Sequence, residues 1–459
     1  MSTTHHVPLK EKIGYSFGDI ASNLIFQTSM LFLVYFYTDV FGISAGVVGT
    51  MMLLTRIWDA INDPIMGTIA DRTKTRWGKF RPYLIWFAVP YGLISVLLFL
   101  APDFSLTGKI VYAYVTYTVM GMIYTAINVP YAALMGVISP NAAERTVISS
   151  FRFVGAFTGG LIVQATIPTI VKMFENEAVG YRVVMIGVAA LSVVLFFITF
   201  TSTKERVEPP KKQKTEFIRD IKELLHNIPW VLIALATVMQ LTFIAMRNGA
   251  IMYYFKYFIG VDNLTLFGRE IPWAMNSAFM IFGTIFTIFG AMSTKWFTAR
   301  MDKGRAYTMF MVLTALFVGA LFFLRADQIE LIFLFQALAS FTLGPLSVLQ
   351  WTIYTDTADF GEVKFSHRAT GLVMAASLFA LKLGLALGGA ILGWIMQAYG
   401  FVPNEVQSEL SLTGIRLLIS IYPAVGALAA GAFMIFYPLT NKKMVEIEAE
   451  LEARRERDA

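Results

Sequence analysis

The segment RIWDAINDPIMG (residues 56–67) decides how the chain is interpreted, because three charged side chains stand where a membrane helix needs apolar ones. The segment follows MMLLT and precedes TIA, so residues 47–69 are long and apolar enough to cross a bilayer core. Arg56, Asp59 and Asp63 are three and four residues apart, which places them on one face of a helix. Charged groups within a membrane are costly and usually face a polar interior, so this face predicts a functional site.

The composition extends this interpretation to the whole chain. Of its 459 residues, 56% are hydrophobic, 15% are charged and none is cysteine, which excludes disulfide and thiol chemistry. The many continuous apolar runs match the thickness of a bilayer, whereas an outer-membrane barrel would show short alternating segments. We therefore predict an all-α membrane protein, and we assign the net charge of +6 to membrane topology and not to nucleic-acid binding.

The apolar runs divide into twelve predicted transmembrane helices, six on each side of a polar segment. The predicted parts are an N-terminal six-helix bundle (1–201), a cytoplasmic central loop (202–229), a C-terminal six-helix bundle (230–438) and a cytoplasmic tail that forms a solvated helix (439–459). Basic residues collect in the loops after spans two, six, eight and twelve, so both termini are expected in the cytoplasm. Similar basic loops after spans two and eight favour two pseudo-symmetric halves with a site at their interface.

The acidic face of the second span predicts a cation site. Two carboxylates one turn apart in a low dielectric repel each other unless a proton or a cation is bound. Pro64 has no N–H, so the Ala60 carbonyl loses its helical partner and becomes a free oxygen ligand. The alternative is an Arg56–Asp59 ion pair that only neutralises a buried helix, but a single pair leaves Asp63 uncompensated.

Further polar side chains lie within other predicted spans. They are Asp19, Ser22, Asn23 and Gln27 in the first, Tyr124, Thr125 and Asn128 in the fourth, Arg152 in the fifth and Lys382 in the eleventh. Amides, hydroxyls, cationic donors and aromatic rings suit a polyhydroxylated ligand such as a sugar. The alternative for any single Asn is a hydrogen bond between helices. The glycine-rich segments GAFTGG (155–160) and LGLALGGAILG (383–393) are assigned to close helix packing.

Several motifs together resemble one transporter family. FGDIASN, YTDVFG, RIWDAINDPIMG, DRTKTRWGKFRP, YTAINVPY, FRFVG and DFGEVKFSHR closely resemble the glycoside–pentoside–hexuronide cation symporters, which include the melibiose permease. The resemblance extends from Lys10 to the twelfth span, and RIWDAINDP followed by RWGKFRP is highly specific. It implies the major facilitator fold and the inward movement of sugars with Na⁺, Li⁺ or H⁺.

The resemblance and the polar pattern together give three sets of expected site residues. The cation is expected at Asp59, Asp63, Thr125 and the carbonyl of Ala60. Substrate contacts are expected from Asn23, Gln27, Tyr124, Asn128, Arg152, Trp351, Ser377 and Lys382. A gate is expected from Arg56, Asp356, Asp359, Glu362 and Arg368. We expect no cofactor; the coupling ion is Na⁺ or H⁺, and Na⁺ would bind at Asp59 and Asp63.

The chain departs from the melibiose-type pattern at the sugar site. Asn23 and Asn128 stand where those members have sugar-binding aspartates. Ala132 and Ser347 stand where they have stacking tryptophans, and Tyr131 and Trp351 lie nearby as expected substitutes. The loss of two anions beside Arg152 and Lys382 predicts a more cationic pocket, which would tolerate or prefer a carboxylate or sulfonate.

The predicted function is cation-coupled import of a glycoside, pentoside, hexuronide or related sugar derivative by alternating access. The expected location is a bacterial inner membrane, and the expected partners are the sugar, a monovalent cation and membrane lipid. A lysolipid transporter of the same family is the nearest alternative. A membrane-embedded enzyme is disfavoured because the sequence has no HExxH, GxSxG or clustered His, and a passive channel because it has no repeated pore motif.

Overall fold

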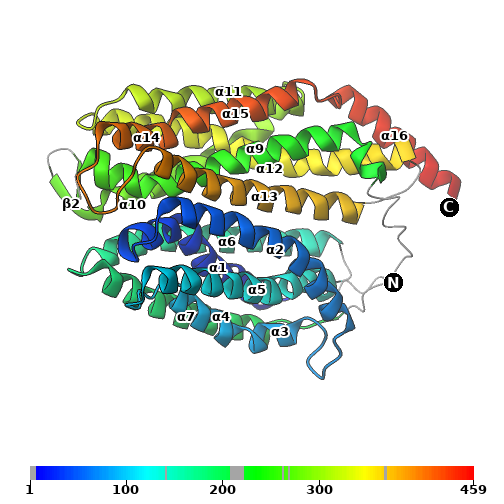
Figure 1. Ribbon diagram of the computed structural model, residues 1–459. Helices are drawn as coiled ribbons and strands as arrows, with labels where there is room; N and C mark the ends of the chain where they lie inside the picture. Colours follow the sequence, from blue (N-terminus) through cyan, green and yellow to red (C-terminus); the bar gives the residue numbers. More distant parts are fainter. Residues whose placement is uncertain are drawn as a thin grey trace. The chain divides into compact units, whose positions relative to one another are not determined.

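The computed structural model describes residues 7–139, 142–206, 222–260, 263–266, 269–365 and 370–458. Nearly all of this described chain is helical, as predicted (Figure 1). The chain forms two compact units. One comprises residues 1–212, 263–278 and 403–405, and the other comprises 213–262, 279–402 and 406–459.

The first part of the chain forms long helices because its apolar runs contain few breakers. They are α1 (Leu9–Tyr35), which continues as a π-helical turn η1 (Phe36–Val40), α2 (Ala45–Arg72), α3 (Arg81–Trp86), α4 (Ala88–Leu98), α5 (Leu106–Ile138), α6 (Ala142–Val171) and α7 (Glu177–Ser202). The short helices α3 and α4 together make one apolar span. Helix α5 remains continuous through Pro130.

The second part repeats this plan and adds a short hairpin. Its elements are α9 (Ile228–Tyr253) with η2 (Tyr254–Ile259), β1 (Asn263–Leu266), β2 (Arg269–Ala274), α10 (Met275–Thr298), α11 (Lys303–Ala320) with η3 (Leu321–Phe323), α12 (Ile329–Phe365), α13 (Thr370–Ala398), α14 (Glu409–Ile419), α15 (Ile421–Ile435) and α16 (Asn441–Asp458). Strands β1 and β2 pair antiparallel. This hairpin between two spans is the one departure from an all-α chain among the described residues.

The helix lengths agree with the predicted twelve spans. Within the described residues, eleven helices are long and apolar enough to cross a membrane by length and composition. Helix α2, with 28 residues, is long enough to cross a bilayer, and its first part, Ala45–Arg56, is apolar. When α2 is included, the number of candidate membrane-spanning helices in the described residues is twelve. The protein is an integral membrane protein.

Glycines bring particular helices into close contact, as the small-residue segments predict. A Cβ atom at Gly155 of α6 would lie 2.5 Å from the Ser16 carbonyl oxygen of α1. A Cβ atom at Gly384 of α13 would lie 2.7 Å from the Val238 carbonyl oxygen of α9. Any side chain there would separate the backbones, so these glycines set the α1–α6 and α9–α13 spacings.

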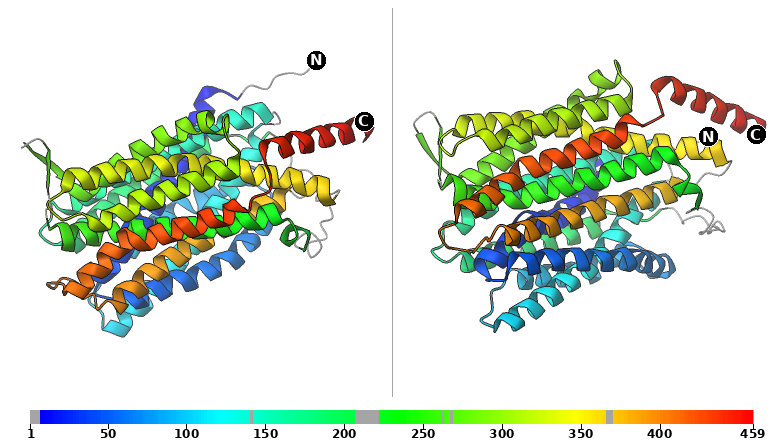
Figure 2. Two further views of the ribbon diagram at one scale, coloured as in Figure 1. Left: turned by 90° about the horizontal axis from the view of Figure 1, so that it is seen from above. Right: turned by 45° about the horizontal axis from the view of Figure 1, so that its top comes forward.

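The C-terminal helix α16 corrects the prediction of a fully solvated tail. Its apolar side chains Met444, Ile447 and Leu451 belong to the hydrophobic core of the second unit and are at most 7% exposed. The Arg454 Nη2 atom donates to the Val363 carbonyl oxygen of α12 at 3.1 Å. Because these three residues recur every three or four positions, they form one stripe that packs on the second unit, and the charged side chains lie on the other faces of the helix. Figure 2 shows the course of α16 after α15.

Candidate functional site

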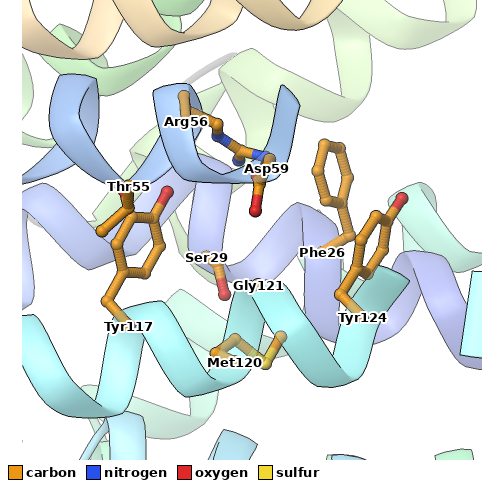
Figure 3. A pocket seen from close by; sticks show the side chains of 9 residues that line it. All are labelled: Phe26, Ser29, Thr55, Arg56, Asp59, Tyr117, Met120, Gly121 and Tyr124. Atoms are coloured by element: carbon orange, nitrogen blue, oxygen red, sulfur yellow. Dashed lines mark hydrogen bonds and ion pairs between the residues drawn. The ribbon is translucent and has the colours of Figure 1, made fainter. Parts of the chain in front are cut away.

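A small cavity lies among α1, α2 and α5 in the first unit, with charged groups on its wall (Figure 3). Its volume is about 30 Å³, enough for one water molecule or a small ion. Its lining residues are Phe26, Ser29, Thr55, Arg56, Asp59, Tyr117, Met120, Gly121 and Tyr124. The cavity therefore includes two members of the charged face of α2.

Arg56 and Asp59 form an ion pair in this cavity. The Arg56 Nη1 atom donates to Asp59 Oδ2 at 3.1 Å, and the two side chains are 15% and 7% exposed. The other carboxylate oxygen faces α5, because a Cβ atom at Gly121 would lie 2.8 Å from Asp59 Oδ1. The ion pair that the sequence left as an alternative is thus present, and the glycine on α5 makes room for the carboxylate.

Asp63 lies one helical turn beyond Asp59 and is linked to α5. The Thr125 hydroxyl donates to Asp63 Oδ1 at 2.7 Å, so the fold brings together two residues predicted to share a cation. The side chains of Ala60 and Pro64 lie outside the described residues, and the free Ala60 carbonyl stays a prediction. In the described part of the chain no three His, Asp or Glu residues are grouped to hold a metal ion, so a cation here would also need hydroxyl or carbonyl oxygens.

A second buried charge pair joins α1 to α6. Arg152 donates from Nε to Asp19 Oδ2 at 2.8 Å and from Nη2 to Asp19 Oδ1 at 3.0 Å. The Tyr131 hydroxyl lies 2.6 Å from Asp19 Oδ2, and its ring centroid is 4.9 Å from the Arg152 guanidinium carbon. Asp19 thus neutralises Arg152 through two parallel hydrogen bonds, so Arg152 contributes less to the predicted cationic pocket than the sequence alone suggested.

The polar stripes of α1 and α5 meet beside this pair. Ser22 donates to Asn128 Oδ1 at 2.7 Å, while the Asn128 amide nitrogen donates to the Tyr124 carbonyl at 3.1 Å. Asn23 donates to the Asp19 carbonyl within its own helix at 2.9 Å. The interhelical hydrogen bond that the sequence left open for Asn128 is therefore formed.

Tyr124 and Gln27 complete the expected N-terminal substrate contacts. The Tyr124 ring stacks on Phe26 with centroids 5.4 Å apart and also lines the cavity that contains Asp59. Gln27 is half-buried on α1 and faces Gly160 of α6, where a Cβ atom would lie 3.9 Å from its amide. One aromatic side chain thus borders both the predicted cation site and the predicted sugar surface.

The expected substrate contacts of the second unit differ in their surroundings. Trp351 is 39% exposed on α12, and its ring is perpendicular to that of Tyr354, with centroids 5.8 Å apart. Lys382 is half-buried on α13. Ser377 is fully buried, accepts a hydrogen bond from Trp230 Nε1 at 3.0 Å and donates to the Val373 carbonyl. The structure corrects the prediction for Ser377, because helix packing occupies its hydroxyl.

The expected gate is only partly described. Asp356 on α12 is 7% exposed and accepts from Lys303 Nζ of α11 at 2.9 and 2.6 Å. Asp359 and Glu362 follow on the same helix and are half-buried, while Arg368 lies outside the described residues. Arg56, also expected to gate, lies in the α2 cavity described above.

A family model described as MFS/sugar transport protein matches residues 14–441. The chain belongs to this family. It is therefore a membrane transporter and not an enzyme, and the match covers both predicted halves.

Individual relatives cover nearly the whole transporter. It is 37% identical over 96% of its length, and 95% of the other chain, to YagG of Escherichia coli, provisionally described as a glycoside/cation symporter. It is 33% identical over 97% of its length, and 92% of the other chain, to the isoprimeverose transporter of Lactiplantibacillus pentosus. A bacterial homologue of the human lysosomal transporter Spinster has the same fold, with 15% identity, a TM-score of 0.69 and coverage of 96% and 97% of the two chains.

Sequence reasoning missed two charged contacts of the transporter. Lys303 was assigned only to a basic loop, yet it pairs with Asp356. Arg247 is 4% exposed in α9, donates to Gln336 at 2.5 Å, and donates to the Ile419 carbonyl at the end of α14. A lone arginine in the apolar run TFIAMRNGAIM is the signal that could have revealed the second contact.

Proposed function

We propose that the transporter is a symporter that couples import of a sugar or glycoside to Na⁺ or H⁺. The observation that carries this proposal is the hydrogen bond between Thr125 and Asp63, one turn from the buried Arg56–Asp59 pair. These groups give α2 and α5 a shared set of oxygen ligands within apolar surroundings, which suits a hard monovalent cation. The names of the two relatives, a glycoside/cation symporter and an isoprimeverose transporter, support the same solute class.

The cation is assigned to Asp59, Asp63, Thr125 and the Ala60 carbonyl. In this proposal Arg56 neutralises Asp59 when no cation is bound. A cation that binds the Asp59 carboxylate then weakens the Arg56–Asp59 ion pair. Tyr124 lines the same cavity as Asp59, so a movement of the Asp59 side chain on cation binding also displaces Tyr124, which belongs to the proposed sugar site. By linkage, a sugar that binds more tightly with the cation present must raise the cation affinity by the same factor.

The sugar is assigned to the remaining polar and aromatic groups. They are Asn23, Gln27, Tyr124, Asn128 and Arg152 in the first unit and Trp351 and Lys382 in the second. The argument for an anionic substrate used the positive charges of Arg152 and Lys382. Because Asp19 balances the charge of Arg152, only Lys382 still supports an anionic substrate. We therefore propose an uncharged glycoside, such as a pentoside-containing sugar, as the principal substrate, ahead of a hexuronide.

Transport is assigned to alternating access, in which residues 1–201 and 230–438 act as the two moving halves. The Lys303–Asp356 pair, with Asp359, Glu362 and Arg368, is the proposed gate. We place the transporter in a bacterial inner membrane with both termini in the cytoplasm. Reporter fusions that are active only in the cytoplasm test this orientation at each terminus.

Uptake into proteoliposomes tests the coupling. Purified transporter is reconstituted, and labelled neutral glycosides and uronides are offered under a Na⁺ gradient or a pH gradient applied separately. One gradient should drive accumulation, and Asp63→Asn should abolish that stimulation. Thr125→Val should reduce the cation affinity about tenfold, because it removes one oxygen ligand and a charge-assisted hydrogen bond. Thr125→Ser is the matched control and should retain coupling.

Two outcomes would contradict the proposal. Gradient-driven uptake that is unchanged in a correctly folded Asp63→Asn protein would remove the cation assignment. Accumulation of lysolipid with no uptake of any sugar would favour the alternative function, that of a lysolipid transporter. Size-exclusion profiles and thermal unfolding of each variant separate lost coupling from lost folding.

A further inference from the structure

Phe26 of α1 contacts both the ion pair of the small cavity and the aromatic side chain next to it. The Arg56 guanidinium carbon lies 6.0 Å from the centroid of the Phe26 ring. The same ring stacks on Tyr124, with centroids 5.4 Å apart and an angle of 24° between the two planes. Figure 3 shows these two rings next to each other at the cavity and the Arg56 side chain directed toward Asp59. Phe26 therefore touches one member of the ion pair and one proposed sugar contact at the same time.

The position of Phe26 on α1 adds a second link between the two sites. Asn23, Phe26 and Met30 are three and four residues apart, so they share one face of the helix. Asn23 belongs to the proposed sugar site, and the Met30 Sδ atom lies 4.0 Å from Arg56 Nη2. One face of α1 thus carries a proposed sugar contact and, within two turns, two contacts with Arg56.

Cation binding at Asp59 would leave the Arg56 guanidinium with a weakened partner. The Arg56 side chain is only 15% exposed, so water can replace little of the lost interaction. An unpaired charge within a membrane helix is costly, and the guanidinium must find another favourable contact. The face of an aromatic ring within about 6 Å attracts a guanidinium, and this attraction is stronger where water is excluded. The Phe26 ring already lies at this distance, so a short movement of the side chain is sufficient.

Tyr124 is placed to respond when Phe26 becomes fixed. Its ring also lies near that of Tyr91 on α4, with centroids 6.2 Å apart. Tyr91 is fully buried, and its hydroxyl donates to the Ser22 carbonyl oxygen at 3.3 Å, so Tyr91 has little freedom to move. A guanidinium that holds Phe26 in place therefore restricts Tyr124 as well. A ring that is fixed before the sugar binds loses less conformational entropy when it does.

We propose that Phe26 is the positioning residue through which the cation raises the affinity for the sugar. When the coupling cation binds the Asp59 carboxylate, the Arg56 guanidinium moves onto the Phe26 ring and holds it against Tyr124. This inference rests on the proposed cation coupling and adds to it the side chain that receives Arg56. A Phe26 that only packed, or only touched the sugar, would change the sugar affinity by the same factor with and without the cation.

Sugar binding to the intact, purified transporter in detergent tests this role. The probe is the neutral glycoside that the unmodified transporter accumulates in proteoliposomes, and calorimetry gives its Kd without the coupling cation and at a saturating cation concentration. The ratio of these two Kd values measures the coupling. Phe26→Leu keeps an apolar side chain but removes the aromatic face, so it should lower the ratio about fivefold. Phe26→Tyr keeps the ring and should keep the ratio of the unmodified transporter.

Phe197→Leu is the matched control, because Phe197 is 37% exposed on α7 and does not line the small cavity. It should leave the ratio unchanged. Thermal unfolding of each variant confirms that the compared proteins are folded.

Three outcomes would contradict the role of Phe26. An unchanged ratio in folded Phe26→Leu, with the sugar affinity lowered equally in both conditions, would make Phe26 a packing or sugar contact only. A ratio that falls in Tyr117→Phe and not in Phe26→Leu would assign the displaced guanidinium to the Tyr117 hydroxyl, which lines the same cavity. A ratio of one in the unmodified transporter would contradict the proposed coupling itself, and this inference with it.

Discussion

Replacing Asp19 by Asn removes the negative charge that balances Arg152 and tests whether Asp19 sets the substrate preference. The asparagine has nearly the same shape, so the change is mainly electrostatic. The guanidinium keeps its place beside the rings of Tyr15 and Tyr131 but loses its anionic partner. A substrate carboxylate could then become that partner, so the variant should gain uptake of anionic sugars.

The geometry of the pair sets the size of the effect. Two hydrogen bonds of 2.8 and 3.0 Å join the groups, and the side chains of Arg152 and Asp19 are 23% and 11% exposed. Breaking a fully buried pair costs about 3–5 kcal/mol, but partial exposure and the remaining amide oxygen reduce this loss to about 2 kcal/mol. A carboxylate that recovers about 1.4 kcal/mol binds about tenfold more tightly.

The assay compares uptake of an uncharged glycoside with that of the uronide of the same sugar. The ratio of uronide to neutral kcat/KM should rise about tenfold in Asp19→Asn, while the melting temperature falls by a few degrees. Asp19→Glu keeps the charge and should keep the original ratio. An active Asp19→Asn transporter with an unchanged ratio would show that Arg152 does not contact the substrate, and the reasoning would fail.

Three further changes test individual assignments. Gly121→Ala places a methyl group 2.8 Å from a carboxylate oxygen in the small cavity, so the cation concentration for half-maximal uptake should rise about tenfold; unchanged cation dependence would contradict this. Ser377→Ala removes the acceptor of Trp230 and should cost about 1 kcal/mol of stability with an unchanged glycoside KM; a higher KM at full stability would restore Ser377 to the substrate site. Ile447→Asp places a charge in the core and should speed proteolysis of the tail. The control Val445→Asp, at a residue that is 65% exposed, should not. Equal cleavage of the two variants would refute the packing of α16.

The local pattern of residues was sufficient for the helices and for part of the site. Long apolar runs predict spans because each helix must satisfy its own backbone in lipid, whatever its neighbours are. Spacing alone placed Arg56, Asp59 and Asp63 on one face of α2. The motif resemblance added Thr125, whose hydroxyl lies 2.7 Å from Asp63 Oδ1.

Only the tertiary structure decided which charges meet. Asp19 and Arg152 are 133 residues apart in the chain, yet they bind each other because Gly155 lets α6 approach α1. Lys303 and Asp356 also lie on different helices, α11 and α12, and they meet only because these two helices pack together. Helical periodicity fixes the direction of a side chain relative to its own axis, whereas its partner depends on how two axes pack. The sequence alone therefore determined that this is a twelve-span transporter with buried charges, and packing determined which of those charges remain for cation and sugar.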